Sequence, residues 1–225
     1  MVMSGCTTSP QAAPPGGLPL RAGSIRIQKA LRSWKAIRQA NVVMQSRDYS
    51  CGSAALATLM RYYFDDDKTE ADILENILGF LTPEEITERQ QNGLSMLDLK
   101  RCAERMGYQA VGVKLPVSAL PKLKGPVLIH LAKGDYEHFA VLRGIRDDRV
   151  YLADPIRGNV QVRIWRFDKE WTGTALVLGR EGFGLPQDHG LSLSAKVPVQ
   201  DYRMALRRAR RIPQLDLTQP STGLH

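Results

Sequence analysis

The segment from Gln45 to Phe64 reads QSRDYSCGSAALATLMRYYF and is the most informative stretch of the chain. From Cys51 onward it contains no Pro, and no Gly after Gly52. Its apolar residues are dense enough for a helix that is buried on most of its surface. The pattern therefore predicts a buried helix that begins at Cys51 and has small residues in its first turn.

Three further helix starts follow that segment. Thr69 and Thr82 are each followed by an acid three residues later, which is the pattern of a capping box. Ser95 caps a third helix, which we expect to end at Gly107. Cys102 lies on this last helix among apolar residues, and we expect it to be a buried structural thiol.

After Gly107 the pattern changes to short β-branched or aromatic runs separated by Gly, Pro or Asp-rich turns. The runs are YQAVGVKL (108–115), PVLIHL (126–131), HFAVLRGI (138–145), RVYLAD (149–154), VQVRIWRF (160–167) and TALVLG (174–179). Helices followed by a meander of five or six closely spaced strands predict an α+β domain with a mainly antiparallel sheet.

The two ends of the chain differ in composition from its middle. We interpret residues 1–41 as a flexible basic leader or signal remnant, 42–183 as the folded domain and 184–225 as a basic extension. Residues 25–39 have apolar residues at helical spacing, which predicts a short helix or part of an extended arm. Residues 200–212 predict one basic amphipathic helix.

The net charge of +8 comes from 31 Lys and Arg against 23 Asp and Glu. Residues 1–47 hold seven basic residues and no acid, and residues 196–225 hold six basic residues and two acids. The middle of the chain is therefore slightly acidic, and we expect no nucleic-acid partner. The basic ends favour contact with an anionic membrane surface, an acidic partner or the acidic middle of the chain itself.

Residues 3–6 (MSGC) resemble the end of a bacterial lipoprotein signal, in which small residues precede a cysteine that becomes lipidated. The apolar stretch that should precede Cys6 is missing, so we expect Met1 to lie inside a longer signal peptide. This interpretation predicts a periplasmic protein, lipid-anchored through Cys6. The alternatives are a disordered tail with a chance cysteine and a cytoplasmic location.

Three separated residues predict a Cys-His-Asp catalytic site. Cys51 stands where free backbone N–H groups and the helix dipole favour a nucleophilic thiolate. His138 opens one strand and Asp154 ends the next, so neighbouring strands could bring them together. Gln45 could place its amide beside the Cys51 N–H and help to hold an oxyanion. The alternatives are a buried thiol for Cys51 and a simple turn for Asp154-Pro155.

The remaining polar residues give no sign of a metal or cofactor. No cluster of His, Cys and carboxylates has the spacing of a metal site, and we expect no metal. No glycine loop has the form that binds phosphates, and we expect no cofactor. His130 lies in a predicted strand, whereas His189 and His225 fall in loop and tail.

These segments together resemble the bacteriocin-processing cysteine peptidase family of the papain-like clan, whose members cleave leader peptides after double-glycine sites. The resemblance covers about residues 45–178 through QSRDYSCGSAAL, GLSMLDLKRCAERMGY, GPVLIHL, EHFAVLRGI, VYLADPIRG and WTGTALVL. It implies a papain-like fold with an N-terminal helical half and a C-terminal antiparallel sheet. It also implies that Cys51 is the nucleophile, His138 the general base and acid, Asp154 its orienter and Gln45 part of the oxyanion hole.

The chain departs from the family at Ser50, where members often have Asp, and it lacks the transporter and ATPase domains of the fused members. A free-standing form most resembles the periplasmic peptidases of functional-amyloid secretion operons. We therefore expect a thiol endopeptidase that cleaves a secreted protein or leader peptide after Gly-Gly or Gly-Ala. The alternatives are a papain-like amidase or acyl transferase, and a non-catalytic leader-binding or chaperone domain.

Overall fold

The computed structural model describes residues 17–22, 25–30, 33–134 and 136–193. The helices are α1 (Trp34–Arg38), α2 (Cys51–Tyr62), α3 (Glu70–Leu78), α4 (Pro83–Asn92), α5 (Met96–Arg105) and α6 (Ile164–Phe167), with a 3₁₀ helix η1 (Val117–Lys122). The strands are β1 (Gly17–Ala22), β2 (Ile25–Ala30), β3 (Gln109–Lys114), β4 (Val127–Lys133), β5 (Tyr136–Arg146), β6 (Arg149–Asp154), β7 (Gly158–Arg163) and β8 (Trp171–Gly179).

The helix starts predicted from the sequence are confirmed. Helix α2 begins at Cys51, and α3, α4 and α5 each begin with a capping box. In each box the hydroxyl of the capping residue (Thr69, Thr82 or Ser95) accepts a hydrogen bond from the backbone N–H of the residue three positions later. The acidic side chain of that later residue accepts a hydrogen bond from the backbone N–H of the capping residue. These local bonds satisfy donors that an open helix end leaves free.

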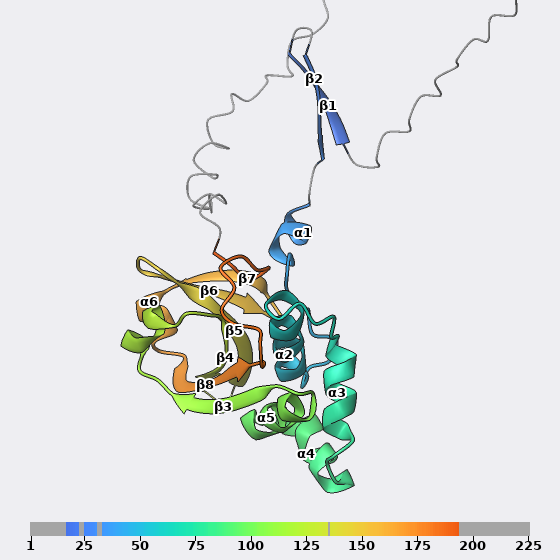
Figure 1. Cartoon of the computed structure of the whole chain (residues 1–225), viewed down its shortest axis with the longest axis vertical. Coiled ribbons are helices and arrows are strands. Elements are labelled where there is room, and N and C mark those ends of the chain that lie inside the picture. The colour runs from blue at the N-terminus through green and yellow to red at the C-terminus, as the bar shows by residue number, and fades with distance from the viewer. Residues whose placement is uncertain (1–16, 23–24, 31–32, 135, 194–225) are drawn as a thin grey trace, which may run out of the picture. The chain divides into compact units, whose positions relative to one another are not determined.

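The helices are followed by a six-stranded antiparallel sheet, which confirms the predicted α+β class (Figure 1). The strand order is β3-β8-β4-β5-β6-β7. Only β4 to β7 form the predicted meander, because β8 returns to pair between β3 and β4. The predicted strand over 160–167 is also too long, since β7 ends at Arg163 and α6 follows.

The sheet buries a separate core on each of its faces. Along β5, Phe139 and Val141 belong to the core shared with α2, α3 and α5, whereas Ala140 and Leu142 belong to the second core. This alternation follows from the two-residue period of a strand. His138 has the same parity as the residues of the second core and lies at the start of β5.

Part of the segment predicted as a flexible leader has regular secondary structure. Strands β1 and β2 pair as an antiparallel hairpin, and the helix expected within 25–39 is confined to α1. The sequence IRIQKA alternates apolar and polar residues, which suits a strand as well as a helix. Asn159 of β7 donates its side-chain amide to the carbonyl oxygens of Arg38 and Ala40, at 3.1 and 2.7 Å, and so fixes the end of α1.

The first residues of the predicted C-terminal extension pack on the folded domain. Leu191 is buried, and the Arg143 guanidinium donates to the carbonyl oxygens of Leu191 and Ser192, each at 2.9 Å. The helix expected at 200–212 and the cysteine Cys6 lie outside the described residues. Among the helices that are described, none is long and apolar enough to cross a membrane.

Candidate active site

Cys51 is the first residue of α2 and is 8% exposed. Gly52, the next residue of α2, packs tightly against its neighbours. A Cβ at this position would lie 3.1 Å from the Leu99 side chain and 3.3 Å from the Phe139 ring. The absence of a side chain at Gly52 therefore lets the helix start lie directly on β5. Packing at this distance places the Cys51 thiol beside the strand that carries His138.

His138 is 4% exposed and connects the other two predicted catalytic residues. Its Nε2 lies 3.2 Å from Asp154 Oδ1, at ion-pair distance but outside the alignment of a linear hydrogen bond. The Cys51 thiol lies close enough to the imidazole to interact with it. The structure therefore brings together Cys51, His138 and Asp154, as the sequence predicts.

The pKa of His138 is set by two opposing effects. Burial alone would lower the pKa, because it disfavours the charged imidazolium. The Asp154 carboxylate and the Cys51 sulfur outweigh burial and raise the pKa of His138 to about 9. The imidazole is therefore protonated at neutral pH, which is the form that can give a proton to a leaving group.

Asp154 is completely buried, and four donors hold its carboxylate. Oδ1 accepts the backbone N–H groups of Ile156 and Arg157, at 2.8 and 2.9 Å. Oδ2 accepts Nε and Nη2 of Arg157, both at 2.7 Å. Burial would raise the pKa of Asp154, but His138 and these donors hold it well below its usual range.

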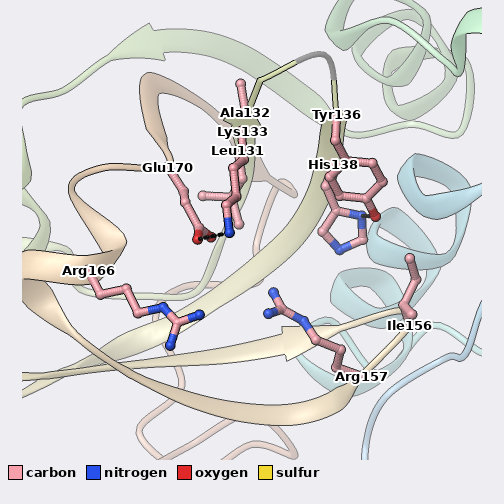
Figure 2. A pocket seen from close by; sticks show the side chains of 9 residues that line it. All are labelled: Leu131, Ala132, Lys133, Tyr136, His138, Ile156, Arg157, Arg166 and Glu170. Atoms are coloured by element: carbon pink, nitrogen blue, oxygen red, sulfur yellow. Dashed lines mark hydrogen bonds and ion pairs between the residues drawn. The ribbon is translucent and has the colours of Figure 1, made fainter.

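Tyr136 packs against the His138 ring, and its place in the site was not predicted from the sequence. Its ring stacks on the imidazole with centroids 5.7 Å apart, and its hydroxyl lies 3.3 Å from His138 Nδ1 (Figure 2). Tyr136 precedes His138 by two residues on β5, so both side chains share one face of the strand. The two-residue spacing alone could not identify it, because residues 134–137 have the sequence of a turn.

Gln45 lies in the loop before α2, and its described bonds tie that loop to the rest of the site. Its backbone N–H donates to the Pro155 carbonyl at 3.0 Å, which joins the loop to the turn after Asp154. Its side-chain Nε2 donates to the Arg47 carbonyl at 2.9 Å. These bonds place Gln45 near the turn that follows Asp154. Its role in an oxyanion hole stays a prediction.

Glu70 is a second residue that sequence reasoning missed. It lies at the start of α3, is 9% exposed, and accepts the Ser46 N–H at 2.9 and 3.0 Å. The Ser50 hydroxyl donates to the same carboxylate through a short hydrogen bond. Glu70 therefore supplies a carboxylate beside Ser50, the position at which the chain departs from the pattern expected of the family. A pairing over this sequence distance leaves no local signal.

The other histidines and thiol do not belong to the site. His130 Nδ1 bonds with the Thr172 hydroxyl at 3.2 Å, and burial lowers its pKa. His189 packs edge-on against Tyr63. Cys102 is fully buried, as predicted, and burial raises its pKa to about 12. Across the part of the chain that is described, no three His, Cys, Asp or Glu residues are grouped as metal ligands.

A thiol at a helix N-terminus, packed against an antiparallel sheet that carries its histidine and aspartate, defines a papain-like cysteine peptidase domain. Residues 39–181 match the sequence profile of the peptidase C39 family. The chain belongs to this family, which is a family of cysteine peptidases.

Two curated relatives named "Probable functional amyloid protease FapD" extend the similarity over most of the chain. The protein from Pseudomonas aeruginosa is 32% identical over 167 residues, which are 74% of this chain and 73% of that protein. The one from Pseudomonas fluorescens is 33% identical over 184 residues, which are 80% of each chain. The lactococcin-G-processing and transport ATP-binding protein LagD of Lactococcus lactis is 25% identical over 60% of this chain and 18% of its own length.

Solved structures show the same fold. The peptidase domain of Streptococcus ComA superimposes with a TM-score of 0.55 at 22% identity, over 64% of this chain and all of that domain. A C39-like peptidase from Bacillus anthracis gives a TM-score of 0.50 at 17% identity, over 64% of this chain and 96% of that one. The predicted papain-like architecture is therefore confirmed.

Proposed function

We propose that this protein is a thiol endopeptidase that cleaves a secreted protein or leader peptide after small residues. One observation supports this most strongly: His138 is buried, carries a raised pKa, and lies between Cys51 and a fully buried, ionised Asp154. A domain that only bound leader peptides would not need this costly arrangement of buried charges.

In the first half of the reaction, the Cys51 thiolate attacks the carbonyl carbon of the scissile peptide bond. The carbonyl oxygen becomes an oxyanion, which the Cys51 backbone N–H and the Gln45 amide would hold. The His138 imidazolium then transfers its proton to the leaving nitrogen, and the C–N bond breaks. An amine product leaves, and the acyl group remains on Cys51 as a thioester.

In the second half, water attacks the thioester carbonyl while neutral His138 accepts a proton from the water. The C–S bond breaks and releases the acid product. The site returns to the thiolate and imidazolium pair with which it began. Asp154 stabilises the imidazolium in both halves and keeps its ring in one orientation.

The substrate class rests on two kinds of similarity. The resemblance to double-glycine leader peptidases supports cleavage after Gly-Gly or Gly-Ala. The FapD proteins are named as functional amyloid proteases, which supports a substrate exported by an amyloid secretion system. We propose a periplasmic location with a lipid anchor at Cys6, on the basis of the MSGC segment at residues 3–6, which resembles the end of a lipoprotein signal. Fractionation of cells with wild-type and Cys6→Ser protein tests the location and the anchor.

The deciding experiment is cleavage of candidate secreted substrates by the full chain and by Cys51→Ala, followed by mass spectrometry of the products. We expect wild type to cut after a Gly-Gly or Gly-Ala pair and Cys51→Ala to be inactive. Cys102→Ala is the matched control, because this buried thiol lies outside the site, and it should cleave normally. Cleavage that survives in Cys51→Ala would show that another residue is the nucleophile.

A further inference from the structure

A pocket of about 220 Å³ is lined in part by His138 of β5 (Figure 2). Tyr136 and His138 of β5 form one wall, Ile156 and Arg157 of the turn after β6 form another, and Arg166 of α6 lies opposite. Leu131, Ala132, Lys133 and Glu170 complete the lining. One water needs only ~15 Å³ on such a measure, so the pocket has room for a side chain.

The chemistry of the reaction indicates which half of a substrate would enter this pocket. The acyl half of the substrate becomes bonded to Cys51, which is not among the lining residues. The leaving nitrogen receives its proton from His138, which is one of them. The chain that follows the scissile bond must therefore leave past His138, and the pocket lies on that side.

The lining of the pocket is rich in positive charge. Lys133, Arg157 and Arg166 contribute three cations against the single carboxylate of Glu170, which lies 3.9 Å from Lys133 Nζ. Arg166 forms no ion pair within the described ranges, and it is exposed. Its guanidinium points into the same space as that of Arg157 (Figure 2). An anion between the two groups would relieve their mutual repulsion.

Arg157 already has a fixed orientation. Its Nε and Nη2 both bind Asp154 Oδ2 at 2.7 Å, and its side chain is nevertheless 46% exposed. A guanidinium that is already held by a buried carboxylate loses little further conformational entropy when it binds a second carboxylate. The pocket therefore combines one preorganised cation, one unpaired cation and enough room for a short acidic side chain.

We propose that this pocket is a subsite for an Asp or Glu side chain of the substrate, directly after the scissile bond. The proposal rests on the proposed peptidase function. It adds a second specificity element on the opposite side of the bond from the small residues. The carboxylate would lie between Arg157 and Arg166, where hydrogen bonds to charged donors are strong.

The test uses three peptides that differ only in the residue after Gly-Gly: Glu, Gln or Lys. For wild type we expect kcat/KM to be about tenfold higher for Glu than for Gln, because such a contact is worth on the order of 1.5 kcal/mol. Lys should be the poorest substrate. In Arg166→Gln the ratio of Glu to Gln should fall to about one, and in Arg166→Glu the Lys peptide should become the best substrate.

Arg166 is the residue to change, since any change at Arg157 would also disturb Asp154. Arg163→Gln is the matched control: this exposed arginine pairs with Asp148, is absent from the pocket lining, and its loss should leave the Glu-to-Gln ratio as in wild type. A wild-type ratio near one, or a high ratio that persists in Arg166→Gln, would overturn the subsite while cleavage itself upheld the peptidase function.

Binding to the inactive Cys51→Ala chain separates the two proposals further. Fluorescence anisotropy with the labelled peptides should give a Kd several-fold lower for Glu than for Gln, and this difference should vanish when Arg166→Gln is added. If no peptide is cleaved by wild type but this binding preference is found, the peptidase function fails, and the pocket is a binding site for an acidic side chain and not a subsite next to a scissile bond. If the peptides bind without preference, the subsite fails.

Discussion

At the scale of single residues, Asp154 has the largest electrostatic role in the site. Its buried charge is compensated by two backbone N–H groups and by the Arg157 guanidinium. Because these donors keep the carboxylate ionised, it can hold a proton on His138 despite the burial of the ring. In the proposed reaction, the proton for the leaving nitrogen is therefore present up to about pH 9.

Asp154→Asn tests this role. Burial would then act on His138 with less opposition, so its pKa should fall from about 9 toward or below the ordinary 6.5. Since activity needs protonated His138, the alkaline limb of kcat/KM should move to lower pH by the same amount. At pH 8 a pKa of 6.5 leaves only about 3% of His138 protonated, so activity should fall by about 30-fold, and by more if the pKa falls below 6.5. A pH profile of kcat/KM whose alkaline limb stays near pH 9 would contradict the account.

Ser50 and Glu70 form a pair whose two members depend on each other. The Glu70 carboxylate binds the Ser50 hydroxyl and the Ser46 N–H, and so holds the loop that leads into Cys51. The family resemblance leads us to expect Asp at the position of Ser50. We infer that Glu70 supplies here the negative charge that Asp supplies there, and that the site has room for only one such charge.

The variant Ser50→Asp should therefore lose about 2 kcal/mol in free energy of unfolding, because it places two carboxylates together in a buried loop. Adding Glu70→Gln should restore about half of that loss, and Glu70→Gln alone should lower kcat/KM with the fold retained. Urea denaturation of both single variants and the double variant measures the coupling. Strictly additive losses would show that the two positions act independently.

At the scale of elements, the turn between β6 and β7 joins three parts of the site. It begins at Asp154, contacts the Gln45 loop through the Pro155 carbonyl, and ends at Gly158. Gly158 has φ of +76°, and a Cβ there would clash with the Arg38 carbonyl oxygen. Only glycine allows this close approach between β7 and the end of α1.

Gly158→Ala should therefore lower the free energy of unfolding by more than about 2 kcal/mol, through both the positive φ and the backbone clash. The same change should reduce turnover, because the turn holds Asp154. Gly112→Ala on β3 is the matched control, as nothing lies within 4 Å of its Cβ position, and it should change stability by less than about 1 kcal/mol. Equal effects of the two substitutions in urea denaturation would refute this role for Gly158.

Elements whose signals are local could be predicted from the sequence, and those set by distant contacts could not. The caps at Thr69, Thr82 and Ser95 define helix starts within four residues, and all three occur as predicted. The insertion of β8 between β3 and β4 depends on pairing across the whole sheet, which no short pattern encodes. The hydrophobic pattern of the IWRF segment fits the end of a strand as well as the short helix α6. Periodicity therefore could not distinguish the strand from the helix.

The same division holds for the candidate site. Cys51, His138 and Asp154 could be identified because each ends or begins an element that the sequence predicts well. Glu70 could not, since its role comes from the packing of α3 against the loop before α2. Tyr136 falls in a turn-like sequence, and only the longer β5 of the structure places it on the face of His138.

At the scale of the whole molecule, the site exists only when the domain is folded. Cys51 comes from the helical half, whereas His138 and Asp154 come from two strands of the sheet. The core shared by α2, α3, α5 and one face of the sheet holds these halves together. Most of the excess positive charge belongs to the two ends of the sequence, whereas the basic pocket is a local feature of the acidic middle of the chain.

The most direct test of the central claim, that folding creates an activated Cys51 beside His138, is alkylation by iodoacetamide, measured by mass spectrometry on the full chain carrying Cys6→Ser. At pH 6.5 the folded protein should take up one label, on Cys51. Cys102 should stay unmodified, because burial raises its pKa to about 12. Labelling should slow at least tenfold in His138→Ala and in urea. Equal labelling of Cys51 in the folded and unfolded chain, or reaction only above about pH 8.5, would contradict the claim.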